Sequence, residues 1–145
     1  MNAGGLQYAD TDGAVYLADA KFSGGATYKT TATIAGTTDP YLYQTERYGN
    51  FSYAIPVANG NYDVTFKFAE IYWSSAGQRA FNVSMEGKTV LSNLDLVAEA
   101  RPKAAYDVKI PVSVTDGVLN MTFTSVVGDA QVNGMVVTAK QVALG

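Results

Sequence analysis

Short segments in which apolar and polar residues alternate, separated by turn residues, are the feature that most limits the fold of this chain. The clearest examples are FSYAIPV (51–57), YDVTFKF (62–68), AFNVSM (80–85) and YDVKIPVSV (106–114). Successive side chains of a β-strand point to opposite faces, so each segment indicates a strand with one buried face. Regular spacing of such strands in 145 residues predicts one domain over residues 1–145. Its predicted fold class is all-β, a two-sheet antiparallel β-sandwich of the jelly-roll type with long N-terminal loops.

The turn residues suggest how these strands pair. Asn59-Gly60 and Asp116-Gly117 are typical of tight turns, so we expect a hairpin across each of them. Gly87 should close another turn after the strand at 80–85, and the last segment, QVNGMVVTAK, should close the sheet. Pro111 cannot donate a ladder hydrogen bond, so it is expected at an edge or a bulge. Only NLDLVAEA has a helical pattern, and it is too short to form a layer.

The first third of the chain has a different composition. Residues 2–40 are rich in Gly, Thr, Ala and Asp and alternate only weakly, so we expect long loops with one or two short strands. One of these loops holds DTDG (10–13), which could suggest calcium but lacks the remaining ligands of an EF-hand loop, so we expect a turn. The loops and the segment after them contain Tyr8, Tyr16, Tyr28, Tyr41, Tyr43 and Tyr48. Long ordered loops on a rigid sandwich often carry binding residues.

The composition excludes several classes of function. With Lys+Arg 10, Asp+Glu 13 and a net charge of -3, we expect no nucleic-acid partner. The absence of His and Cys removes imidazole bases, thiolate nucleophiles and most zinc or copper sites, so we expect no metal and no cofactor. No apolar run is long enough to span a bilayer, so no membrane partner is expected. Ten Tyr residues favour a hydrated recognition surface, because a tyrosine tolerates water at one end.

Tyr72 and Trp73 stand side by side where a strand pattern ends. Continuing the alternation of the preceding strand would turn Glu70 and Tyr72 toward the core, yet the apolar residues Ala69 and Ile71 fall on the face that had been polar. This change of phase is typical of a bulge or a strand end, which would carry both rings into the following loop. The rings could then cap the open end of the sandwich or form an exposed stacking surface, and spacing alone does not decide between these interpretations.

Two acidic residues and one basic residue accompany the aromatic positions. Glu46, Arg47 and Glu70 could include a catalytic or ligand-orienting carboxylate. We favour an ion pair between Glu70 and Arg47, because a carboxylate at an inward position needs a partner. Such a pair would fix the segments that carry Tyr48 and Tyr72, which makes these three residues supports of a binding site.

Several motifs, in a fixed order, carry a resemblance to a known family. YQTERYG (43–49), KFAEIYW (67–73), FNVSMEGK (81–88) and VVGDAQVNGMVV (126–137) resemble the malectin and malectin-like carbohydrate-binding modules over nearly the whole chain. Each motif alone would be weak, but their combination is specific. The resemblance implies a jelly-roll sandwich that binds glucose-containing oligosaccharides through aromatic side chains on loops at one end, helped by an aspartate. The chain is more similar to the bacterial members, which implies an extracellular, cell-surface or periplasmic location and appended catalytic domains in a longer protein.

The resemblance also assigns roles to individual positions. The matching ligand-binding positions are Tyr28, Tyr48, Tyr72, Trp73 and Asp129. The match of Tyr28 crosses a loop of different length, so Tyr16 is the alternative there.

We expect a non-catalytic carbohydrate-binding module and not an enzyme. One face of a pyranose carries C–H groups that pack on an aromatic ring, while its hydroxyl groups need partners such as the Asp129 carboxylate. The expected partner is a gluco-configured oligosaccharide or polysaccharide. Two alternatives stay open: a protein-interaction or adhesion domain whose tyrosine-rich loops grip a peptide, and a glycosidase that uses two of Glu46, Glu70 and Asp129 as acid and base.

Overall fold

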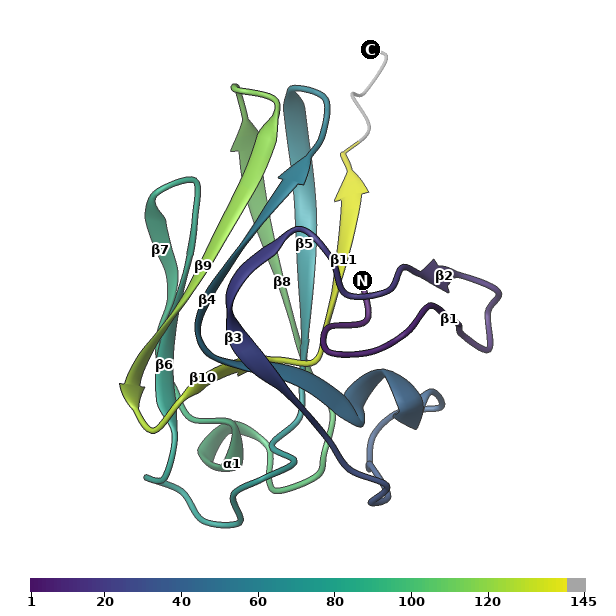
Figure 1. The fold of residues 1–145 in the computed structure, drawn as a ribbon, viewed down its shortest axis with the longest axis vertical. Helices are drawn as coiled ribbons and strands as arrows, with labels where there is room; N and C mark the ends of the chain where they lie inside the picture. The colour runs from purple at the N-terminus through teal and green to yellow at the C-terminus, as the bar shows by residue number, and fades with distance from the viewer. Residues whose placement is uncertain (141–145) are drawn as a thin grey trace.

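The computed structural model describes residues 1–140, and nearly all of its regular structure is β-strand (Figure 1). The strands are β1 (Tyr8–Ala9), β2 (Val15–Tyr16), β3 (Phe22–Lys29), β4 (Thr45–Pro56), β5 (Gly60–Phe68), β6 (Ala80–Met85), β7 (Lys88–Leu94), β8 (Tyr106–Val114), β9 (Val118–Val127), β10 (Ala130–Val132) and β11 (Gly134–Ala139). The short helices η1 (Pro40–Tyr43) and α1 (Leu96–Glu99) lie in the connections, and no helix in this part of the chain is long and apolar enough to cross a membrane. The predicted all-β fold class is confirmed. The predicted domain extended to residue 145, and residues 141–145 lie outside the described residues.

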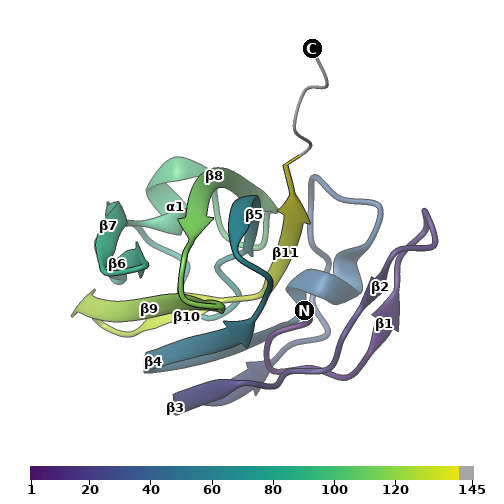
Figure 2. The same ribbon diagram turned by 90° about the horizontal axis from the view of Figure 1, so that it is seen from above.

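Two antiparallel sheets form the body of the molecule (Figure 2). The larger sheet has six strands. Its β4 pairs with β3 along one edge and with β9 and β10 along the other, and β6 and β7 continue the sheet beyond β9. The smaller sheet has three strands in the order β11-β5-β8. β1 and β2 form a separate pair that lies to the side of both sheets, next to η1 (Figures 1 and 2).

The core between the sheets consists of the apolar residues that alternation predicts to point inward. Phe66 and Phe68 of β5 and Phe123 of β9 are fully buried. The rings of Phe66 and Phe123 meet edge to face across the two sheets with centroids 5.8 Å apart. Phe51 of β4 stacks on Phe123 at 4.6 Å. Aromatic pairs at such separations add about 0.5 to 1.5 kcal/mol to the stabilisation from burial, so this layer joins the two sheets.

The two hairpins predicted at Asn59-Gly60 and Asp116-Gly117 are wrong. β4 and β5 lie in different sheets, and so do β8 and β9, so the loops between them cross the sandwich. The crossing loops hold each other: Val57 N donates to Gly117 O at 3.1 Å, and Gly117 N donates to Asn59 Oδ1 at 2.7 Å. The last segment crosses as well, because β10 joins the larger sheet and β11 the smaller one. Alternation identifies the buried face of a strand but not its neighbour, and these turn residues suit either kind of loop.

Three other predictions, about a turn, a proline and a short helix, are confirmed. Glu86-Gly87 closes the β6–β7 hairpin, and both residues have positive φ, 50° and 77°, as a type I′ turn requires. Pro111 lies in β8, an edge strand of the smaller sheet. The helix α1 is one short turn, and the carboxylate of its N-cap Asp95 accepts a hydrogen bond from Ala98 N at 3.2 Å.

The N-terminal third contains more strand than predicted. β3 spans eight residues and pairs with β4 from Phe22 to Lys29. All eight residues are exposed, so the strand lacks the apolar alternation by which a strand is found in a sequence. The turn predicted at DTDG is confirmed, because Asp10 Oδ1 accepts the backbone N–H groups of Asp12 at 2.9 Å and Ala14 at 2.8 Å.

Candidate functional site

One pocket gathers all five residues that were predicted to contact a ligand. Its volume is about 260 Å³, and its lining is Tyr28, Glu46, Tyr48, Tyr72, Trp73, Arg79 and Asp129. These residues come from β3, β4, the loop that follows β5, the position before β6 and the turn between β9 and β10. Pockets for drug-sized ligands occupy about 300 to 1,000 Å³, so this one suits a small ligand or the end of a longer one.

Three aromatic rings of the pocket orient one another. Tyr72 is 58% exposed and lies nearly perpendicular to Tyr28 and to Trp73, with centroid distances of 5.4 and 4.7 Å. Edge-to-face contacts fix the ring planes and still leave ring surface accessible to a ligand. Of the two interpretations of the adjacent rings, exposed stacking surface fits Tyr72, whereas Trp73 is half-buried. Tyr16, the alternative to Tyr28, is buried in a separate apolar cluster.

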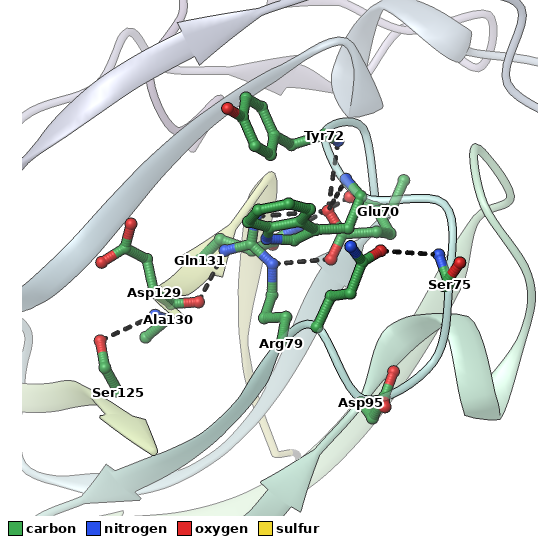
Figure 3. A network of polar contacts seen from close by, with 12 residues as sticks. Glu70, Tyr72, Ser75, Arg79, Asp95, Ser125, Asp129, Ala130 and Gln131 are labelled. Carbon is green, nitrogen blue, oxygen red and sulfur yellow. Dashed lines mark hydrogen bonds and ion pairs between the residues drawn. The ribbon is translucent and has the colours of Figure 1, made fainter. Parts of the chain in front are cut away.

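A buried ion pair supports the loop that carries Tyr72 and Trp73 (Figure 3). Arg79 Nε lies 2.6 Å from Glu70 Oε1, and the two side chains are 4% and 1% exposed. Glu70 Oε2 accepts the backbone N–H groups of Tyr72 and Trp73, both at 3.2 Å. Arg79 Nη1 donates to the backbone carbonyl of Asp129 at 2.6 Å. One buried pair therefore fixes both the aromatic loop and the turn that carries Asp129.

The predicted ion pair between Glu70 and Arg47 is wrong. Arg47 pairs with Asp19 at 2.9 Å, and its guanidinium group lies over the ring of Phe22, 3.4 Å from the centroid. Successive residues of a strand point to opposite faces, so Glu46 reaches the pocket while Arg47 points away from it. Arg47 therefore holds the N-terminal segment against β4 and takes no part in supporting the aromatic loop.

Glu46 is part of the pocket wall. Its side chain lines the pocket although the residue is only 1% exposed. Among residues 1–140, no hydrogen-bond partner faces its Oε2. Burial raises the pKa of Glu46 to about 8; the guanidinium of Arg79 opposes this rise, and the carboxylates of Glu70 and Asp129 add to it. In the folded protein, Glu46 is therefore mostly protonated at neutral pH.

Asp129 is positioned through its backbone. Besides the hydrogen bond from Arg79 to its carbonyl, the preceding Gly128 has φ of 62° and packs so closely that a Cβ there would lie 2.8 Å from Gln78 O. Only glycine fits such a position without strain. The side chain of Asp129 is exposed, and its carboxylate points away from the Arg79 guanidinium (Figure 3). The turn is therefore fixed while its acidic group faces solvent.

Sequence reasoning gave Arg79 no role and placed Glu46 behind the site. A signal existed for each. Glu46 precedes Tyr48 by two positions in one strand, so both side chains occupy the same face. Arg79 is the first basic residue after Glu70, the inward carboxylate that required a partner.

The pocket offers aromatic faces, one exposed carboxylate and one protonated carboxyl group. Aromatic faces pack against C–H groups, and the two carboxyl groups can hydrogen-bond hydroxyl groups of a ligand. In the part of the chain that the structure describes, no group of three Asp or Glu side chains is arranged to hold a metal ion. The arrangement can therefore bind an uncharged, hydroxyl-rich molecule with an apolar face.

Comparison with known proteins gives matches over most of the chain. A family model described as Malectin domain matches residues 1–141. Malectin-B of Xenopus laevis is 33% identical in an alignment of 129 positions that covers 83% of this chain and 47% of that protein. Kinesin-like protein KIN-14E of Oryza sativa subsp. japonica is 34% identical in an alignment of 158 positions, gaps included, that covers 99% of this chain and 14% of that protein. The chain thus spans about half the length of the malectins that it matches.

Solved structures share the fold. The crystal structure of Bacteroides uniformis beta-glucuronidase resembles this chain with a TM-score of 0.86 at 20% identity, over 97% of this chain and 18% of that one. At such low identity, the likeness shows a common sandwich and nothing about the reaction.

Proposed function

The chain belongs to the malectin domain family, and from this membership and the pocket we propose that it is a carbohydrate-binding module. The proposed ligand is a glucose-containing oligosaccharide or polysaccharide. The proposed ligand-binding residues are Tyr28, Tyr48, Tyr72, Trp73 and Asp129. The observation that carries the proposal is that these rings and this carboxylate line one pocket of about 260 Å³.

The side chains of the pocket match the two kinds of surface on a pyranose. The exposed ring of Tyr72 and the half-buried ring of Trp73 offer faces for the axial C–H groups of the sugar. The carboxylate of Asp129 would accept hydrogen bonds from two neighbouring hydroxyl groups, and such charge-assisted bonds are the stronger ones. Because sugar hydroxyl groups are already well hydrated, the net gain per contact is small. We therefore expect a dissociation constant of about micromolar to millimolar.

We propose binding without hydrolysis. A glycosidase of the usual kind needs two carboxyl groups that flank the scissile bond, one as acid and one as base or nucleophile. Glu70 is occupied by Arg79 and by two backbone N–H groups, and Glu46 is 1% exposed. Asp129 is the one carboxylate of the pocket lining that is exposed in the described residues. Glu70 is therefore unavailable, and membership of the malectin domain family favours recognition over acid–base catalysis by the other two carboxyl groups.

Calorimetric titration with glucose disaccharides of every α and β linkage tests the proposal. The wild type should bind at least one of them, and Trp73→Ala should weaken that binding at least tenfold while the protein stays folded. Tyr41→Ala is the matched control, because Tyr41 is a 40% exposed ring outside the pocket lining. Its affinity should equal that of the wild type. Release of free glucose during the incubation would show that the chain is an enzyme.

Failure of the folded wild type to bind any glycan would overturn the proposal and favour a peptide ligand for the tyrosine-rich surface. We also propose that the chain is one module of a longer protein, since it covers 47% of Malectin-B and 14% of KIN-14E. By resemblance to the bacterial modules, we propose an extracellular, cell-surface or periplasmic location.

A further inference from the structure

Glu46 is the pocket residue whose hydrogen-bonding capacity the protein leaves unused. Its Oε2 is buried and lacks a partner within the described residues 1–140, although the side chain lines the pocket. Leaving a buried polar atom without a partner costs about 1 to 3 kcal/mol, so such an atom in the wall of a pocket is a natural place for a bound water or a ligand group to hydrogen-bond. A ligand that enters the pocket can supply the missing hydrogen bond.

We propose that Glu46 is a specificity-determining residue, whose carboxyl group hydrogen-bonds a hydroxyl group of a neutral sugar and disfavours sugars that carry a carboxylate. This inference rests on the proposed function of the same pocket. It adds a buried, polar contact to the exposed contacts of the rings and of Asp129.

The neighbours of Glu46 explain why a neutral hydroxyl group suits this position. The charged and titratable side chains that line the pocket with it are Tyr28, Tyr48, Tyr72, Arg79 and Asp129, and the carboxylate of Glu70, outside the lining, also acts on it. Burial raises the pKa of Glu46 to about 8, so the protonated carboxyl group can donate one hydrogen bond and accept another. A sugar hydroxyl group is likewise a donor and an acceptor, so it can accept the hydrogen bond that the carboxyl group donates and donate the one that it accepts.

The charge balance of the pocket explains the exclusion of acidic sugars. Arg79 is the one cation in the lining formed by the described residues, and Glu70 neutralises it at 2.6 Å. The carboxylate of Asp129 and the buried carboxyl group of Glu46 remain. A uronate would therefore meet one anion directly and would have no uncompensated cation to offset its desolvation.

The first test measures the dissociation constant as a function of pH. Its ligand is the glucose disaccharide that binds the wild type most tightly. Since Glu46 titrates with a pKa of about 8, roughly one tenth of the wild type carries a protonated Glu46 at pH 9. Wild-type affinity should therefore be about tenfold weaker at pH 9 than at pH 6. Glu46→Gln keeps a neutral donor and acceptor of similar shape, so its affinity should match the wild type at pH 6 and change less than about twofold by pH 9. Glu99→Gln, a change at an exposed glutamate, should follow the wild-type profile.

A second measurement needs no variant. Calorimetry at pH 8 in two buffers of different ionisation enthalpy should show uptake of about half a proton per disaccharide bound, because binding favours the protonated form of Glu46. The corresponding disaccharide with one C6 hydroxymethyl group oxidised to a carboxylate should bind at least tenfold more weakly at pH 6.

The outcomes separate the two proposals. If the wild type binds no glycan at any pH, the proposed function itself is contradicted. Equal wild-type affinity at pH 6 and pH 9, zero proton uptake, the same pH profile in Glu46→Gln, or equal affinity for the uronate would each leave carbohydrate binding intact and overturn the role of Glu46.

Discussion

Replacing Arg79 by Met should destabilise the protein strongly, because it removes the partner of a buried carboxylate. Met fills much of the same space but cannot hydrogen-bond Glu70, whose side chain is 1% exposed. Breaking a buried pair by removing one partner costs about 3 to 5 kcal/mol. The Asp129 carbonyl also loses its bond from Arg79 Nη1, so the upper part of this range is expected.

The thermal shift follows from the size of the chain. With about 2.1 cal/mol/K of unfolding entropy per residue, 145 residues give about 0.3 kcal/mol/K. A loss of about 3 to 5 kcal/mol should therefore lower Tm by about 10 to 16 °C. Urea denaturation should show a lower midpoint with an unchanged slope, since the surface exposed on unfolding stays the same.

Three further variants make this test specific: Arg101→Met, Glu70→Gln and the double variant Glu70→Gln/Arg79→Met. Arg101→Met changes an exposed arginine and should cost less than about 0.5 kcal/mol. The double variant Glu70→Gln/Arg79→Met removes both charges and should recover part of the loss, which measures the coupling between the two residues. If Arg79→Met costs under about 1 kcal/mol, or if the double variant is as unstable as the sum of the two single ones, the ion pair is not the support that we describe.

Three more predictions concern the core, the rim and the buried acid. Phe66→Ala should cost about 3 to 5 kcal/mol in urea denaturation, because the ring is fully buried between the sheets; Phe22→Ala, at an exposed position, is the comparison. Asp129→Asn should weaken glycan binding about tenfold in calorimetry without changing Tm, because it removes an exposed charge that accepts hydrogen bonds; unchanged affinity would exclude Asp129 from the contact. The raised pKa of Glu46, about 8 against an ordinary 4.5, means that the folded state binds more protons between these values, so wild-type stability falls as pH rises through this window. In urea denaturation, the free energy of unfolding of Glu46→Gln relative to the wild type should rise by on the order of a few kcal/mol from pH 4.5 to pH 8. It should not rise further above pH 8.

The buried face of each strand could be predicted from the sequence, but the neighbours of the strands could not. Phe66 and Phe68 occur at alternate positions, and both are fully buried. Alternation reports only which side of a strand is apolar. The loops at Asn59 and Gly117 consequently looked like hairpin turns, whereas they cross between sheets and bond each other. Strand pairing depends on contacts between segments far apart in the chain, and a local sequence pattern does not reveal these contacts.

The candidate site shows the same limit. The rings and the aspartate that line the pocket were named from motifs, while the pairing of charges behind them was assigned wrongly. Glu70 has Arg79 as its partner and both side chains are buried, whereas Arg47 points to the face of β4 opposite Glu46 and reaches Asp19. The choice between two arginines is set by strand faces and loop paths, which become definite only in the folded chain.

The buried pair gives a physical reason for combining a rigid support with a weakly binding surface. Each sugar contact yields little net free energy, so affinity is sensitive to any entropy lost in ordering the site. Glu70 ties down the backbone of Tyr72 and Trp73, and Arg79 ties down the turn that carries Asp129. The two sides of the pocket are thereby ordered before a ligand arrives. A variant at Arg79 that still folds should therefore lose glycan affinity without losing a single side chain proposed to touch the sugar.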